Sequence, residues 1–130
     1  MNDIIIGRFH HAHLQVTNIE RGIRFLRNNL GVTEVGRVFY ENGSVAAVYV
    51  KAGSAYIEVS PVETPVPQPA ICFEVEDIRK IFETLKKNGV CIDQDITPTK
   101  SKCLQMYIKD DDGNRFELFQ ILTESFLFQQ

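Results

Sequence analysis

The sequence predicts an α+β fold built from two copies of a βαβββ module. Residues 12–32 align with residues 71–90, mostly at an offset of 59 positions, and segment 55–59 aligns with segment 114–118 at that same offset. Within each copy, one alternating strand pattern precedes a helical pattern, and three further strand patterns follow it. Because two distant segments share one offset, we interpret the 130-residue chain as a single domain of two homologous modules. The modules span residues 9–62 and 69–121, joined by the proline-rich linker 63–69.

In the first module, residues 11–16 alternate in polarity, which is typical of a strand with one buried face. Asn18 follows and can accept a hydrogen bond from the free backbone N–H groups that begin a helix. Four apolar side chains then share one helical face, and Gly31 ends the helix because glycine accepts a positive φ without steric cost. The four are Ile19, Ile23, Leu26 and Leu30. Further strands are expected near 33–40, 44–51 and 53–61, with a turn at 41–44.

The second module repeats this order. A strand at 70–75 leads to the cap Asp77, and Gly89 ends the helix. The apolar helical face consists of Ile78, Ile81, Phe82 and Leu85, and further strands are expected near 90–96, 102–109 and 114–121. The acidic run 110–112 superficially resembles a calcium-binding loop, but Arg115 occupies the position where an EF-hand needs glycine. We therefore interpret this run as part of a hairpin turn.

Composition excludes several classes of function. A net charge of −3 without runs of Lys or Arg argues against nucleic-acid binding. No apolar stretch approaches the ~20 residues of a membrane span, and the N-terminus lacks the pattern of a signal peptide. The three cysteines, Cys72, Cys91 and Cys103, are odd in number and lack CxxC spacing, which favours free thiols in a reducing compartment. We therefore expect a cytoplasmic protein that binds neither nucleic acid nor membrane.

Strand alternation assigns polar residues to the face opposite each helix. In the first strand, Leu14 and Val16 should meet the helix, which leaves His11 and His13 on the other face and directs His10 away from them. The same alternation places polar residues on the helix-free face of the last strand in each module and of the first strand in the second module. The helix-free faces therefore carry His11, His13, Tyr56, Glu58, Ala70, Cys72, Glu74, Glu117 and Phe119.

Four motifs carry a resemblance to a known family. They are His-x-x-Leu-x-Val-x-Asn at 11–18, Leu-Gly at 30–31, Phe-Glu-Val-Glu-Asp-Ile at 73–78 and Asp-Gly-Asn-Arg-Phe-Glu-Leu at 112–118. Together with the repeat, they resemble the vicinal oxygen chelate superfamily, which includes glyoxalase I, methylmalonyl-CoA epimerase, extradiol dioxygenases and the fosfomycin- and bleomycin-resistance proteins. The resemblance implies a cupped mixed sheet with helices on the outer face, a metal inside the cup, and commonly a homodimer.

The resemblance also implies positions for metal ligands. Carried onto this sequence, they are His11, Glu58, Ala70 and Glu117, of which the alanine cannot bind a metal. A His–Glu–Glu set suits a divalent ion such as Zn, Ni, Mn, Co or Fe. The missing ligand weakens this site or opens a position for water or substrate, and it disfavours dioxygenase and fosfomycin-type chemistry. Cys72, two residues after Ala70, and its repeat counterpart His13 are the candidates to replace the missing ligand.

Two functional hypotheses follow. The first is a metal-assisted enzyme of glyoxalase or epimerase type, a lyase or isomerase, in which Glu58 or Glu117 moves a proton next to a metal-chelated carbonyl. Its substrate contacts would be His13, Tyr56, Cys72 and Phe119. The second is a metal-free protein that sequesters a small molecule, as in the bleomycin-resistance branch, with aromatic side chains available at Tyr40, Tyr49, Tyr56, Tyr107 and Phe119. A domain whose cup is filled by side chains and that serves only as an accessory module is a third alternative.

Overall fold

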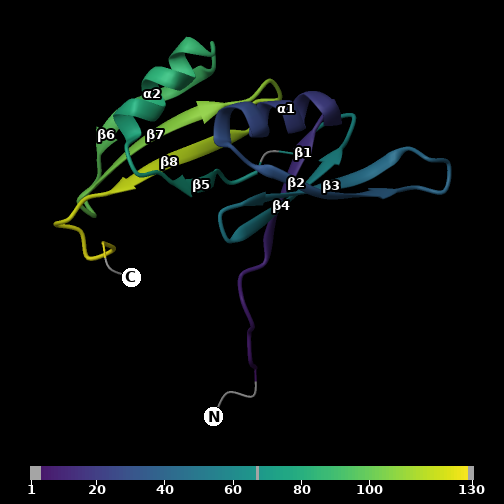
Figure 1. Cartoon of the computed structure of the whole chain (residues 1–130), viewed down its shortest axis with the longest axis horizontal. Coiled ribbons are helices and arrows are strands. Elements are labelled where there is room, and N and C mark those ends of the chain that lie inside the picture. The colour runs from purple at the N-terminus through teal and green to yellow at the C-terminus, as the bar shows by residue number, and fades with distance from the viewer. Residues whose placement is uncertain (1–3, 67, 129–130) are drawn as a thin grey trace. The chain divides into compact units, whose positions relative to one another are not determined.

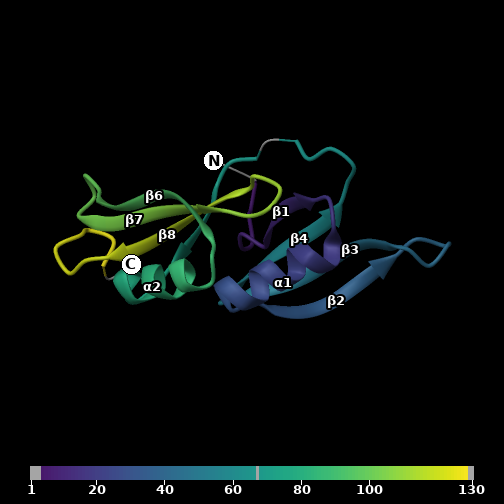
Figure 2. The same ribbon diagram turned by 90° about the horizontal axis from the view of Figure 1, so that it is seen from above.

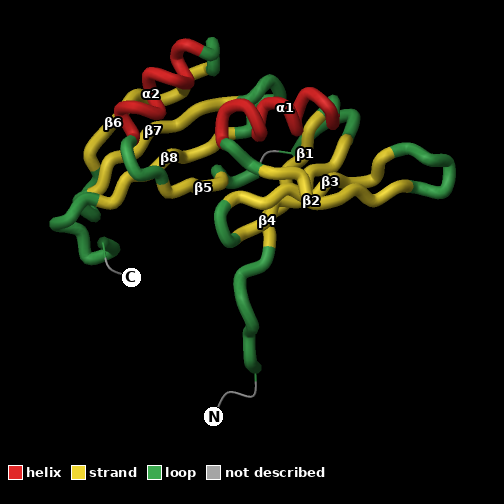
Figure 3. The backbone as a smooth tube through the Cα atoms, in the orientation of Figure 1, coloured by secondary structure: helices red, strands yellow, loops and turns green. Residues whose placement is uncertain are grey.

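The computed structural model describes residues 4–66 and 68–128, so Pro67 of the expected linker lies outside the described residues. The chain divides into two compact units, Met1–Thr64 and Pro65–Gln130, each with the element order βαβββ (Figures 1 and 3). The first unit contains β1 (His11–Val16), α1 (Ile19–Leu30), β2 (Thr33–Phe39), β3 (Val45–Ala52) and β4 (Ala55–Pro61). The second contains β5 (Ile71–Glu74), α2 (Ile78–Lys87), β6 (Cys91–Pro98), β7 (Cys103–Lys109) and β8 (Arg115–Ile121). The predicted α+β class is confirmed.

Each unit holds one four-stranded mixed sheet, in the order β1-β4-β3-β2 or β5-β8-β7-β6. The first and last strands of a unit pair in parallel, and the other neighbours pair antiparallel. Ala12 lies opposite Ile57 in the first unit, and Ile71 lies opposite Phe116 in the second. The residue numbers of both members of the pair increase by 59 from the first unit to the second. The offset seen in the sequence is therefore also the offset of the strand register.

Local chemistry fixes where the helices begin and end. The Asn18 side chain accepts a hydrogen bond from the backbone N–H of Arg21 at 3.0 Å, and Asp77 accepts one from Lys80 at 3.2 Å. Such caps satisfy N–H groups that have no partner within the helix. At the other end of α1, Gly31 adopts the left-handed conformation with φ of 64°, as the sequence predicts.

Each helix covers one face of its own sheet (Figure 2). On that face of the first unit, Leu14, Val16, Ile57 and Val59 are buried, and Leu26 of α1 is completely buried against them. In the second unit Ile78 and Leu85 of α2 are buried in the same way, together with Phe116 and Leu118. Ile81 and Phe82, also expected in this core, are only half-buried. The burial follows the alternation, so the intervening polar residues lie on the helix-free face.

The acidic run before β8 forms a hairpin turn, as expected. The Asp110 carboxylate accepts hydrogen bonds from the backbone N–H groups of Asp112 and Asn114, at 2.9 and 2.8 Å, and from the Asn114 side-chain amide at 2.9 Å. Burial raises the pKa of Asp110. With φ of 80°, Gly113 supplies the positive dihedral angle that the turn requires. The carboxylate thus stabilises the backbone of the turn.

The segment after β8 folds partly onto its own unit. Ser125 is buried, and its hydroxyl lies 3.5 Å from the buried thiol of Cys103 on β7. Phe126 and Phe128 are exposed. Ser125 therefore packs against the core of its own unit. No helix in the described part of the chain is long and apolar enough to cross a bilayer.

Matched core truncations should destabilise the protein. We expect Leu26→Ala and Leu85→Ala each to lower the free energy of unfolding by about 2–5 kcal/mol, because each leaves a cavity under a fully buried helix position. Val38→Ala, at an exposed position on β2, is the control and should change it by less than about 0.5 kcal/mol. Urea denaturation followed by circular dichroism measures all three. Equal effects of the buried and exposed substitutions would contradict the assigned cores.

Candidate functional site

Three potential metal ligands gather on the helix-free face of the first sheet. His11 and His13 stand two residues apart on β1, so they project to the same side, and Glu58 lies opposite His13 on the parallel strand β4. One donor atom from each side chain lies within 4.8 Å of the other two. These three residues form the one such group of His, Cys, Asp or Glu found within residues 4–66 and 68–128.

Glu58 is the centre of this cluster. Its Oε1 lies 2.9 Å from His13 Nδ1 and 3.5 Å from His11 Nε2. A carboxylate only accepts hydrogen bonds, so the closer contact places an N–H on His13 Nδ1. The side chains of His11 and Glu58 are 27% and 19% exposed, whereas that of His13 is 66% exposed. The cluster is therefore partly desolvated on one side and open to an incoming ligand on the other.

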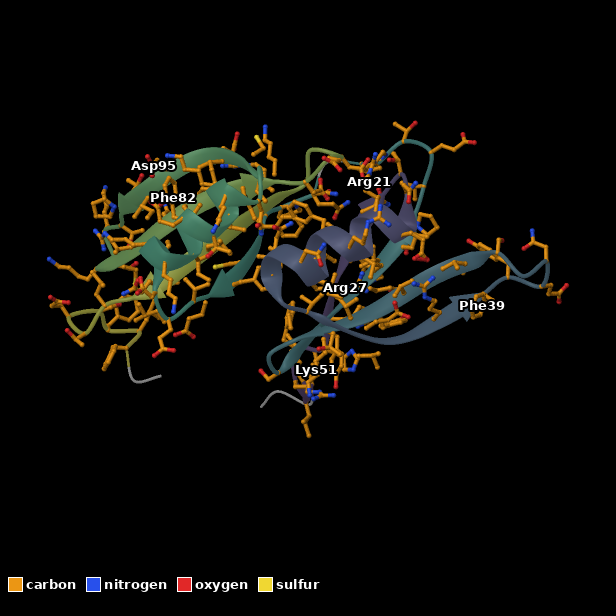
Figure 4. The ribbon with its side chains drawn as sticks, turned by 45° about the horizontal axis from the view of Figure 1, so that its top comes forward. Arg21, Arg27, Phe39, Lys51, Phe82 and Asp95 are labelled. Atoms are coloured by element: carbon orange, nitrogen blue, oxygen red, sulfur yellow. The ribbon has the colours of Figure 1, made fainter. Side chains whose placement is uncertain are left out.

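Tyr49 adds a hydroxyl to the cluster from β3. It pairs with Glu58 across the antiparallel β3–β4 ladder, and its ring makes an edge contact with His11 at 5.7 Å. Burial raises the pKa of the Tyr49 phenol, and so does its hydrogen bond to the negatively charged Glu58. Lys51, two residues after Tyr49 on β3, points away from α1. This helix can be found in Figure 4 by its labelled residues Arg21 and Arg27.

His10 differs from the expectation based on alternation. It is exposed, as expected for a surface residue, but it precedes β1 and does not follow the strand pattern. Its ring stacks on Tyr56 at a centroid distance of 5.1 Å, and its Nδ1 lies 2.9 Å from Nδ1 of His11. The side chain therefore turns toward the cluster and not away from it.

A second, smaller arrangement lies on the helix-free face of the second sheet. Cys72 on β5 pairs with Glu117 on β8, and Glu74 pairs with Phe119. Although Cys72 as a residue is exposed, burial around its thiol is the largest cause that raises its pKa, to about 12. The charge of Glu117, a hydrogen bond to it, and the charge of Glu74 add to this effect. Cys72 is thus a protonated thiol that donates to Glu117 at neutral pH.

The structure brings together part of the predicted metal set. His11 and Glu58 are neighbours, as that set requires, and Tyr56 pairs with His11. Glu117 belongs to the second unit together with Cys72 and Phe119, so its membership in the metal set stays a prediction. His13 contributes a possible ligand atom to the cluster, and its expected role as a substrate contact stays a prediction.

The donor set of the cluster fits a divalent metal ion. Two imidazoles and one carboxylate are ligands that Zn, Ni, Mn, Co and Fe accept. This composition also supplies, from a single unit, a second histidine as a ligand, whereas Ala70 leaves the set implied by the resemblance one ligand short. The sequence indicated this second histidine, because His11 and His13 share one face of a strand. It did not indicate the contacts of Tyr49, which depend on the strand register, or those of His10, which depend on how the chain turns before β1.

The comparison with known protein families agrees with the fold. The model of the Glyoxalase/Bleomycin resistance protein/Dioxygenase superfamily matches residues 8–118. The chain belongs to this superfamily. Membership confirms the resemblance carried by the repeat and the four motifs. Within the superfamily, the β1–β4 cluster is the candidate site of this member. No curated protein sequence matches the chain significantly.

Solved structures share the architecture of this chain. A member of the Glyoxalase/bleomycin resistance protein/dioxygenase superfamily from Sphaerobacter thermophilus is 21% identical, with a TM-score of 0.77, and the match covers 90% of this chain and 99% of that one. The fosfomycin resistance protein FosX from Listeria monocytogenes is 18% identical, with a TM-score of 0.76 and coverage of 92% and 98%. TioX from Micromonospora sp. ML1 is 18% identical, with a TM-score of 0.72 and coverage of 89% and 100%. At these identities the likeness establishes the fold alone.

The contact between Cys72 and Glu117 leads to a testable prediction about the reactivity of the thiol. With a pKa of about 12, Cys72 should react with iodoacetamide at pH 8 on the order of 100-fold more slowly than an unperturbed thiol, because the thiolate is the nucleophile. Glu117→Gln removes the negative charge and should accelerate the reaction roughly tenfold. Peptide mass spectrometry resolves Cys72 from Cys91 and Cys103. Glu63→Gln is the control, and an unchanged rate in Glu117→Gln would contradict the assigned cause.

Proposed function

We propose that the protein is a metal-assisted enzyme acting on a small oxygenated organic molecule. The observation that carries the proposal is the cluster of His11, His13 and Glu58, whose donor atoms lie within 4.8 Å of one another on an open sheet face. The reaction is proton transfer next to a carbonyl, of the glyoxalase or epimerase type, which makes the protein a lyase or isomerase. Membership in a superfamily whose description includes glyoxalases supports this choice.

Each residue has a role in this proposal. His11, His13 and Glu58 hold the divalent ion, which when bound polarises adjacent substrate oxygens and stabilises negative charge as a Lewis acid. A carboxylate, Glu58 or Glu117, moves the proton, and a positioned base contributes on the order of 10²–10⁴-fold to such a step. Tyr49, which donates to Glu58, orients that carboxylate. Cys72 does the same for Glu117, because its protonated thiol donates a hydrogen bond.

The remaining predicted site residues contact the substrate in this proposal. Tyr56 offers an aromatic surface beside His11, and Phe119 offers one in the second unit next to Cys72 and Glu117. We retain Tyr56, Cys72 and Phe119 as substrate contacts and add the exposed edge of His13. A homodimer in the cytoplasm completes the proposal. The chemistry common to the substrates is a pair of neighbouring oxygens able to chelate one ion.

A metal-free binding protein is the second candidate function, and two observations favour it. Ala70 occupies one of the four ligand positions that the resemblance implies, and its side chain cannot bind a metal. In addition, Glu58 already has protein partners, because His13 lies at hydrogen-bond distance and Tyr49 donates to it. Such a carboxylate needs no ion to be satisfied. In this alternative, Tyr49 and Tyr56 supply aromatic surface for sequestering an apolar or aromatic compound.

Metal titration separates the two functions. We expect the metal-stripped protein to bind one Zn²⁺ or Co²⁺ per chain, and His11→Ala, His13→Ala and Glu58→Gln each to weaken binding by at least ~100-fold, because each removes a direct ligand. Isothermal titration calorimetry measures the stoichiometry and affinity. Ser60→Ala, next on the same face of β4, is the matched control and should bind as the parent does.

Two further outcomes are informative. If Glu117→Ala loses the metal while His13→Ala retains it, the ion uses His11, Glu58 and Glu117, as the resemblance implies. If the parent protein binds no divalent metal, the enzyme proposal fails and the metal-free alternative stands.

Proton transfer is visible without knowing the final product. In D₂O, the metal-loaded protein should catalyse exchange of the C–H next to the carbonyl in a panel of glyoxal–thiol adducts and acyl thioesters, followed by proton NMR. Chelator treatment should abolish the exchange, and Glu58→Gln should lower its rate by about 10²-fold or more, because both the ion and the carboxylate are lost from the step. Full exchange in the chelated, metal-free protein would contradict the mechanism.

A further inference from the structure

The segment before β1 carries a residue with no role in the function proposed above. We propose that His10 is a positioning residue for the metal site, holding the His11 ring so that its Nε2 faces the ion. The inference rests on the proposed function, since it concerns the same site. Its basis is the 2.9 Å contact between Nδ1 of His10 and Nδ1 of His11, made at the side of the His11 ring away from Glu58.

The two nitrogens of His11 have separate partners. Nε2 lies 3.5 Å from Glu58 Oε1, so this nitrogen belongs to the cluster. Nδ1 contacts His10, and at 2.9 Å only one of the two facing nitrogens carries a proton. A neutral histidine that offers the Nε2 lone pair to a metal carries its proton on Nδ1. That Nδ1–H then donates to His10, an outer partner of the kind that orients metal-binding histidines.

His10 is itself held in place by the strand it contacts. Its backbone carbonyl accepts a hydrogen bond from the N–H of Tyr56 at 3.2 Å. Its ring stacks on that of Tyr56 with only 18° between the planes, and the Arg8 guanidinium lies 5.8 Å from the centre of the same tyrosine ring. Tyr56 therefore anchors the segment that precedes β1. The acceptor nitrogen of His10 is fixed by β4, the strand that also carries Glu58.

Two substitutions separate the hydrogen bond from the stack. His10→Asn keeps an acceptor at the δ position but removes the ring, whereas His10→Phe keeps a ring on Tyr56 but removes the acceptor. We expect His10→Phe to weaken Zn²⁺ binding ~10-fold or more, the range seen when outer partners of metal ligands are removed. His10→Asn should bind Zn²⁺ within about threefold of the parent. Because His10 is exposed and lies outside the strands, both variants should fold, which circular dichroism checks.

A spectroscopic readout tests the hydrogen bond directly. In ¹⁵N-labelled, zinc-loaded parent protein, NMR should detect scalar coupling between the two Nδ1 atoms through the shared proton, and His10→Phe should lack it. If zinc binds but the coupling is absent, or if His10→Phe binds as tightly as the parent, the inference is wrong while the proposed function stands. If His10→Asn is as weak as His10→Phe, the ring and not the acceptor matters, and the inference is again wrong. If the parent binds no Zn²⁺ at all, the proposed function fails first.

Discussion

In each unit the first strand pairs in parallel with the last, β1 with β4 and β5 with β8, and this pairing determines both the core and the polar face. A helix connects the first strand to the rest of its sheet and covers one side of it. Because side chains alternate along a strand, apolar residues of the paired strands meet the helix while the intervening residues lie together on the other face. The helix-facing core and the candidate site are thus two consequences of one strand register.

The two units use the same register for different chemistry. At equivalent positions 59 residues apart, the first unit places His13 beside Glu58, and the second places Cys72 beside Glu117. An imidazole next to a carboxylate forms a polar pair with donor atoms for a metal, whereas a thiol next to a carboxylate stays protonated because burial and negative charge oppose its ionisation. The first unit also carries His11 where the second carries Ala70. The repeat has therefore kept the scaffold in both units and a metal-competent donor set within the first.

Much of the site was predictable from the sequence, because its ingredients depend on alternation and on the repeat. The shared face of His11 and His13 follows from their spacing, and the equivalence of Glu58 and Glu117 follows from the common offset. The contacts of Tyr49 were not predictable, since they require the β3–β4 register, in which Ala52 pairs with Ala55 across a two-residue turn. His10 was assigned to the opposite face because alternation was extended one residue past the strand, where the chain no longer follows it.

The sequence by itself determined the fold class, the order of the elements, the helix caps at Asn18 and Asp77, and the face on which polar residues within the paired strands lie. These properties depend on local spacing and on the hydrogen bonds of neighbouring residues, so they can be inferred one segment at a time. Tertiary structure decided which of those polar residues touch. The 2.9 Å approach of His13 to Glu58 and the turn of His10 onto Tyr56 join residues about 45 positions apart. Only the pairing of β1 with β4 brings these residues together, and no local sequence pattern determines contacts between residues so far apart in the chain.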